Sequence, residues 1–127
     1  MATTVPGESA AKNQPFTRRL GFALNGLRVA WRTESSFRIH LVATVAVIAA
    51  LLWLRPSALW WAAVALAVAA VLAAELANSA VEYLADHLHP DEHPEIKLVK
   101  DCMAGAVLVA SLGALAVAAA LLWDLFV

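Results

Sequence analysis

Apolar residues along this chain gather into three long runs separated by short polar stretches. The runs cover about residues 37–54, 58–86 and 100–123. The first run is short, yet each is long enough to cross the hydrocarbon core of a bilayer as a helix. Arg55, Pro56 and Ser57 predict a tight turn, because proline rarely continues a helix. The pattern predicts an all-α integral membrane protein with three transmembrane helices.

Residues 16–33 show a helical spacing of apolar positions in place of a continuous run. The positions that share one face are Phe16, Leu20, Leu24, Leu27 and Trp31. Arginines border this face, and an apolar face with a basic rim is typical of an amphipathic helix lying on a membrane surface. Residues 1–15 mix small polar residues with Pro and Lys and predict a disordered tail. Residues 16–127 are expected to form one domain.

Composition agrees with a membrane protein. Hydrophobic residues make up 62% of the chain and charged residues 15%, against about 45–50% and about 25% in soluble domains. The formal net charge of −1 gives no global field for nucleic acid. The single Cys102 excludes an intramolecular disulfide and a multi-cysteine metal site. Three helices bury little area against one another in lipid, so we expect an oligomer.

Basic residues indicate the orientation of the spans. Arginines cluster before the first span and two lysines precede the third, whereas the loop between the first two spans has only Arg55. The positive-inside rule places the amino terminus and the 87–100 loop in the cytoplasm.

A polar stripe interrupts the second span. Its members follow one another at intervals of three, four and four residues: Glu75, Asn78, Glu82 and Asp86. A charged residue at a helix centre costs roughly 2.5–3.5 kcal/mol on insertion scales, so the stripe is expected to serve a buried or interfacial site. The interpretation without chemistry is a hydrogen-bonded cluster that fixes the oligomer.

Two further polar sets reach the same membrane face. One precedes the first span and consists of Glu34, Arg38 and His40; the other is Lys100 and Asp101. Carboxylates from two helices suit Mg²⁺, basic residues suit phosphate, and a remaining carboxylate suits a general base. Together these groups indicate phosphoryl transfer. No P-loop or kinase glycine-rich loop is present, so ATP would be bound by side chains on helices.

Several of these residues resemble the prokaryotic membrane diacylglycerol kinase family, which includes the undecaprenol kinases. The most specific element is the run from Glu75 to Glu82. The other matching residues are Gly26, Leu27, Arg28, Trp31, Glu34, Phe37, Arg38, Asp86, Lys100, Asp101 and Ala104 to Val107. The resemblance covers about residues 16–122.

The resemblance implies a homotrimer in the bacterial inner membrane, with active sites shared between subunits at the cytoplasmic interface. The implied reaction uses ATP and Mg²⁺ to convert diacylglycerol into phosphatidic acid. Glu75 would be the general base and Asn78 would orient it, while Glu34 and Glu82 would hold the metal. The implied nucleotide-binding residues are Arg18, Phe22, Glu34, Glu82, Asp91, Glu92, His93, Lys100 and Asp101. The implied lipid-binding residues are Arg28, Trp31, Ser36, Phe37, Arg38, Glu75 and Ala104.

Alternatives stay open at this point. His40 stands where diacylglycerol-specific members often have an acid, which favours undecaprenol as an alternative substrate; it is equally well interpreted as a packing residue. A small ion channel or transporter subunit would carry acids near the middle of the membrane, whereas this stripe stops at Glu75. A structural membrane adaptor would not need the acids at all.

Overall fold

The computed structural model describes residues 14–127 and folds them into helices with no strand in that range. The helices are α1 (Phe16–Thr33), α2 (Ser35–Leu54), α3 (Ala58–Leu88) and α4 (Pro94–Phe126). The last three are long and apolar enough to cross a membrane, which confirms that the three apolar runs form long helices suited to membrane spans. The predicted tail, residues 1–15, lies outside the described residues except for Gln14 and Pro15.

The connections follow from local chemistry. Arg55 ends α2 in the left-handed conformation, with φ of 51°, and its N–H donates to the carbonyl of Leu51 at 2.8 Å. Pro56 then follows and cannot continue the helical hydrogen bonding. At the other end of α3, His93 begins α4 because its Nδ1 accepts the N–H of Glu95 at 3.2 Å. Pro94 suits the first helical position, where no N–H partner is needed.

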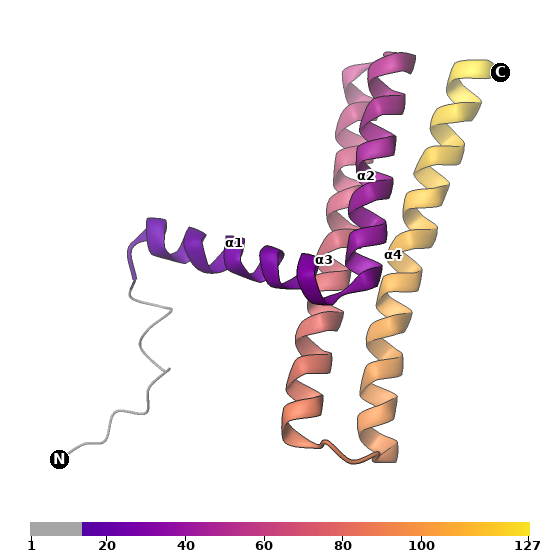
Figure 1. The fold of residues 1–127 in the computed structure, drawn as a ribbon. Helices are drawn as coiled ribbons and strands as arrows, with labels where there is room; N and C mark the ends of the chain where they lie inside the picture. The colour runs from indigo at the N-terminus through magenta and orange to yellow at the C-terminus, as the bar shows by residue number, and fades with distance from the viewer. Residues whose placement is uncertain (1–13) are drawn as a thin grey trace.

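Helix α3 is the centre of the arrangement. It runs antiparallel to α4 along most of its length, while α2 packs on another part of its surface (Figure 1). Helix α1 meets the bundle at its carboxyl end and points away from it, so α3 and α4 continue past α1 as a hairpin (Figure 1). We call the end that carries residues 89–93 the loop end, and the opposite end the turn end.

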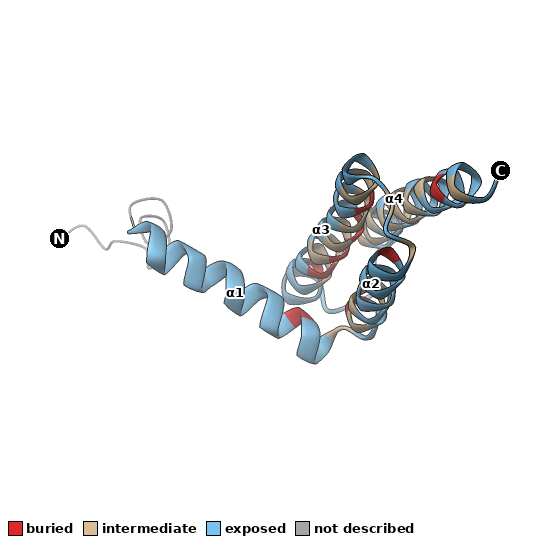
Figure 2. Cartoon of the chain, turned by 90° about the horizontal axis from the view of Figure 1, so that it is seen from above, coloured by how far each residue is buried: buried red, intermediate tan, exposed pale blue. Residues whose placement is uncertain are grey.

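Little of the chain is buried within a single copy. A small core of Leu51, Val64 and Leu121 lies at the turn end, packed against Trp60 and Trp61. Most of the surface of α2, α3 and α4 is exposed (Figure 2), and only 6–17% of each apolar span is buried. Apolar surface of this extent requires lipid or other subunits around it.

The corner between α1 and α2 is held by polar groups around a buried ring. Arg38 donates from Nη1 to the carbonyl oxygens of Trp31 and Arg32, at 3.0 and 3.2 Å. These carbonyls lack partners at the end of a helix, so the guanidinium caps α1. Phe37, in the first turn of α2, has 1% of its surface exposed. Tyr83 of α3 donates to the hydroxyl of Thr33 and ties α1 to α3. The corner therefore fixes where α1 leaves the bundle.

Candidate functional site

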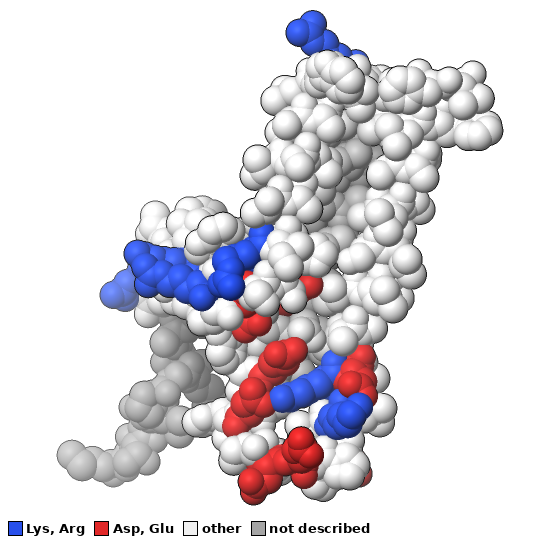
Figure 3. Space-filling view, turned by 45° about the vertical axis from the view of Figure 1, so that its right-hand side comes forward, with Lys and Arg blue, Asp and Glu red and all other residues white. Residues whose placement is uncertain are grey.

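The predicted stripe on α3 runs from the buried part of the helix to its open end. The Glu75 side chain is 6% exposed, Asn78 and Glu82 are half-buried, and Asp86 is exposed. Intervals of three and four residues place them along one side of the helix. On the face drawn in Figure 3, acidic and basic side chains gather below and along α1, while the surface toward the turn end is mostly uncharged. The stripe thus joins an apolar region to a charged one.

Glu75 at the buried end of the stripe is paired with His40 of α2. The distance between His40 Nε2 and Glu75 Oε1 is 3.1 Å, and the His40 side chain is 28% exposed. One turn along α3, the Ser79 hydroxyl donates to the carbonyl of Glu75 at 3.0 Å. Removing a carboxylate from water is costly unless a charged or hydrogen-bonding partner replaces the water, and the imidazole of His40 provides that partner.

Asn78 and Glu82 form the second contact of the stripe. Asn78 Nδ2 donates to Glu82 Oε1 at 2.9 Å. The Oδ1 atom of the same amide is buried and has no partner among residues 14–127. A buried oxygen without a donor is uncommon in proteins, and an ion or a water molecule often satisfies such an atom. Asn78 Oδ1 and the Glu82 carboxylate are both hard oxygen donors, the kind that Mg²⁺ prefers.

The two lysines at the start of α4 are paired with acids. Lys100 donates to Asp86 of α3, and Lys97 donates to Asp101 one turn further along α4. Lys97 precedes the apolar run of α4. The hydrogen bond to Asp101 raises the pKa of the Lys97 ammonium group above its usual range. Lys100 is the lysine that joins the stripe to α4, through its contact with Asp86. This contact places the Lys100 ammonium group at the exposed end of the stripe.

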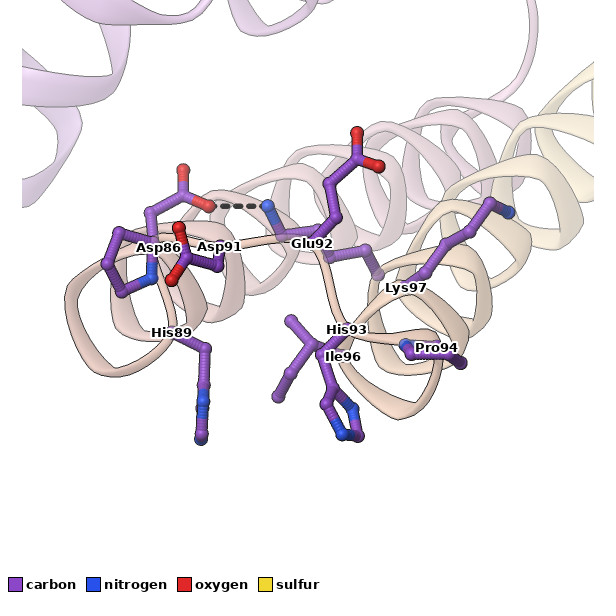
Figure 4. Close-up of a pocket in the computed structure, with 10 residues that line it drawn as sticks. Asp86, His89, Asp91, Glu92, His93, Pro94, Ile96 and Lys97 are labelled. Atoms are coloured by element: carbon purple, nitrogen blue, oxygen red, sulfur yellow. Dashed lines mark hydrogen bonds and ion pairs between the residues drawn. The ribbon is translucent and has the colours of Figure 1, made fainter.

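A pocket of about 570 Å³, which we call the loop pocket, lies between the end of α3 and the start of α4. Its lining includes the predicted nucleotide-binding residues Asp91, Glu92, His93 and Lys100, together with Asp86. The side chains do not all point one way: the imidazoles of His89 and His93 lie on one side, and the carboxylates of Asp86 and Glu92 on the other (Figure 4). Asp101, also predicted, does not line this pocket and faces Lys97.

A second cavity, the α2–α4 groove, lies over α3 between α2 and α4 and has a volume of about 310 Å³. Its lining is mostly apolar and includes Val47, Val71, Leu72 and Leu115, and among the described residues His40 is its one ionisable member. Glu75 is not part of the lining. His40, which pairs with the buried carboxylate of Glu75, is thus also part of the groove lining.

The predicted residues on α1 are separated from the loop pocket within one chain. Arg18, Phe22, Arg28 and Trp31 are exposed on α1, which points away from α3 and α4 (Figure 1). Arg18 donates to Gln14 at 2.8 Å. Their assignment to nucleotide or lipid binding stays a prediction. For Arg18 and Phe22 to contact a nucleotide in the loop pocket, that pocket would have to belong to a second copy of the chain.

The predicted metal and lipid residues are likewise spread over several elements. Glu34 lies between α1 and α2, and within residues 14–127 no three His, Cys, Asp or Glu side chains lie close enough to share an ion. Ser36 and Ala104 are exposed, whereas Phe37 is fully buried and Arg38 caps α1. The roles of these residues remain predictions.

Sequence reasoning leaves the role of His40 undecided, and the structure places it on Glu75. The sequence does contain a signal for this pairing. His40 is an ionisable residue at the edge of the first apolar run, and Glu75 is the first ionisable residue within the second apolar run. Two such residues at the same membrane edge of adjacent helices are expected to pair, because each is expensive alone in lipid.

The sequence is similar to a known protein family and to several of its members. The family described as prokaryotic diacylglycerol kinase matches residues 21–122. A diacylglycerol kinase of Synechocystis is 39% identical over 102 residues, which is 80% of this chain and 58% of that relative. This chain therefore spans little more than half the length of the Synechocystis protein.

Two further relatives match over more of their own length. The diacylglycerol kinase of Escherichia coli K12 is 32% identical over 114 residues, covering 87% of this chain and 93% of the relative. The undecaprenol kinase of Bacillus subtilis is 32% identical over 94 residues, covering 74% of this chain and 76% of the relative.

Proposed function

Because this chain belongs to the prokaryotic diacylglycerol kinase family, we propose that it transfers the γ-phosphoryl group of ATP to the hydroxyl of diacylglycerol and yields phosphatidic acid. The observation that carries the proposal is the carboxylate of Glu75, buried in a membrane helix at the end of a polar stripe. An acid in that position can meet a lipid alcohol that stays in the bilayer, and the stripe leads from it to the charged loop end.

In the proposed reaction, Glu75 accepts the proton of the lipid hydroxyl, and the lipid oxygen attacks the γ-phosphorus in line with the leaving ADP. Lys100 at the loop pocket places positive charge beside the phosphates. Asn78 holds Glu82 in place through the hydrogen bond at 2.9 Å. The chain thus supplies a base at the lipid side and a cation at the nucleotide side.

A magnesium ion fits the oxygen donors present. Mg²⁺ usually takes one or two carboxylates and completes its shell with water and phosphate oxygens. Glu34 and Glu82 would hold it, and the unpartnered Asn78 Oδ1 supports an additional oxygen contact. When bound, the ion neutralises developing charge on the phosphates.

The proposed setting is the bacterial inner membrane, with the amino terminus and the loop end in the cytoplasm. Helix α1 would lie on the membrane surface, as its exposed Phe16, Leu20 and Leu24 and its arginines favour. A homotrimer would cover the exposed spans and bring α1 of one subunit to the loop pocket of another. Undecaprenol is the second candidate substrate, favoured by the match to the B. subtilis undecaprenol kinase.

The test is lipid phosphorylation by the purified full chain, with radiolabelled ATP, Mg²⁺ and either diacylglycerol or undecaprenol in mixed micelles. Glu75→Gln is expected to abolish labelled lipid and to elute as the same oligomer as the wild type. Asp124→Asn, at the turn end, is the control and should keep wild-type activity. Normal turnover by Glu75→Gln would contradict the base assignment. A wild type that labels neither lipid would contradict the kinase proposal and favour a channel subunit or a structural adaptor.

A further inference from the structure

The contact between His40 and Glu75 involves one particular oxygen of the carboxylate, and this bears on catalysis. His40 Nε2 faces Oε1 of the carboxylate at 3.1 Å, and within residues 14–127 it is the one polar side-chain partner of that carboxylate. The nearby polar side chains of α3 are engaged with other atoms, since Asn78 Nδ2 donates to Glu82 and the Ser79 hydroxyl donates to the backbone carbonyl of Glu75. The orientation of the Glu75 carboxylate therefore depends on α2.

The backbone at His40 is well placed to impose that orientation. Phe37, one turn earlier, is fully buried and anchors the start of α2. Thr44, one turn later, donates from its hydroxyl to the His40 carbonyl at 2.7 Å. An imidazole on a fixed helix has few accessible rotamers, so its N–H can hold one carboxylate oxygen in a defined position.

We propose that His40 is a positioning residue for catalysis: its Nε2–H holds Oε1 of Glu75, so that Oε2 is left free to accept the proton of the substrate hydroxyl. The inference rests on the proposed function, because it presupposes Glu75 as the base. The His40 side chain also lines the α2–α4 groove. Free imidazole added to a variant without this side chain would reach Glu75 from that groove.

The experiment compares kcat and KM of three purified variants in the lipid phosphorylation assay. His40→Leu keeps an apolar side chain of similar size and removes the donor, so kcat is expected to fall about 30-fold with KM for ATP unchanged. His40→Gln keeps an N–H donor near the position of Nε2 and should retain kcat within about 5-fold of the wild type. His40→Ala should lose activity like His40→Leu and regain at least about 3-fold on addition of imidazole.

Val45→Ala is the control on the same helix, since the Val45 side chain is 66% exposed and does not line the α2–α4 groove. It should keep wild-type kcat. The proposal is overturned if His40→Leu keeps wild-type kcat, or if His40→Gln is as inactive as His40→Leu and imidazole restores nothing to His40→Ala.

The chosen readouts also separate this inference from the proposed function. A role in folding alone would lower the active fraction of every His40 variant without recovery by free imidazole, and that result overturns the positioning role. An inactive wild type would instead overturn the kinase proposal and the inference with it. An active wild type, an inactive Glu75→Gln and fully active His40 variants would overturn the positioning role alone.

Discussion

Lys100 of α4 donates a hydrogen bond to Asp86 of α3, and both side chains line the loop pocket. The contact joins the last turn of one long helix to the first turns of the next. It also neutralises the cation that the proposed function assigns to the ATP phosphates. A phosphate group that binds here has to compete with the carboxylate of Asp86 for the same ammonium group.

This competition gives the first prediction. Lys100→Met is expected to raise KM for ATP about 10- to 100-fold, because a charge-assisted contact to phosphate is lost. Asp86→Asn leaves Lys100 without its competing partner and should lower KM for ATP about 2-fold. Initial rates at varied ATP and saturating lipid check both values. An unchanged KM in Lys100→Met would remove this lysine from the nucleotide site.

The second prediction concerns Glu82 and magnesium. Glu82→Gln replaces a charged oxygen donor with a neutral amide, so the Mg²⁺ concentration for half-maximal rate should rise about 10-fold. Chelation with EDTA should stop lipid phosphorylation by the wild type, and added Mg²⁺ should restore it. Glu95→Gln, an exposed acid near the loop end, is the control and should leave the Mg²⁺ requirement as it is. The same requirement in Glu82→Gln and wild type would exclude Glu82 as a ligand.

The third prediction separates packing from lipid contact at Phe37. Phe37 is 1% exposed in the first turn of α2, so Phe37→Ala should destabilise the fold by about 3 kcal/mol. Ile39, two residues further, is 67% exposed, and Ile39→Ala should leave Tm nearly unchanged. Thermal denaturation in detergent measures both. A normal Tm together with a raised KM for lipid in Phe37→Ala would instead make Phe37 a substrate contact.

The fourth prediction concerns the turn end. Trp60 Nε1 donates to Asp124 Oδ2 at 2.8 Å and links the start of α3 to the end of α4. Trp60→Phe keeps an aromatic ring but loses this hydrogen bond, which should cost about 1 kcal/mol of stability. Lipid phosphorylation at room temperature should be unaffected, because the stripe lies toward the other end of α3. A large loss of kcat in this variant would mean that the turn end is coupled to the site.

The helical spans can be predicted well from the sequence because their signal is local. Long apolar runs, a proline turn after Arg55 and an amphipathic spacing before Ser35 each depend on neighbouring residues. Helix α4 begins at Pro94, earlier than the predicted start near residue 100. The reason is that proline, although typical of loops, is favoured at the first helical position, and the His93 side chain caps the same turn.

The candidate site is predicted less completely because it depends on how helices are rotated against one another. The stripe from Glu75 to Asp86 follows from helical spacing alone. The pairing of His40 with Glu75 depends on the rotation of α2 about its axis, and an apolar helix in lipid has no polar face to fix that rotation from sequence. The predicted residues on α1 can meet the loop pocket only if α1 and the pocket belong to two different copies of the chain.

The unequal lengths of the spans bear on how the protein sits in bilayers of different thickness. Helices α3 and α4 have 31 and 33 residues, roughly 46–50 Å at 1.5 Å per residue, whereas the hydrocarbon core is about 30 Å thick. Helix α2, with 20 residues, barely crosses it. A thicker bilayer would draw the carboxylates of α3 toward the acyl chains, while a thinner one would release them into the headgroup layer. The depth of the stripe would then depend on membrane composition as well as on the fold.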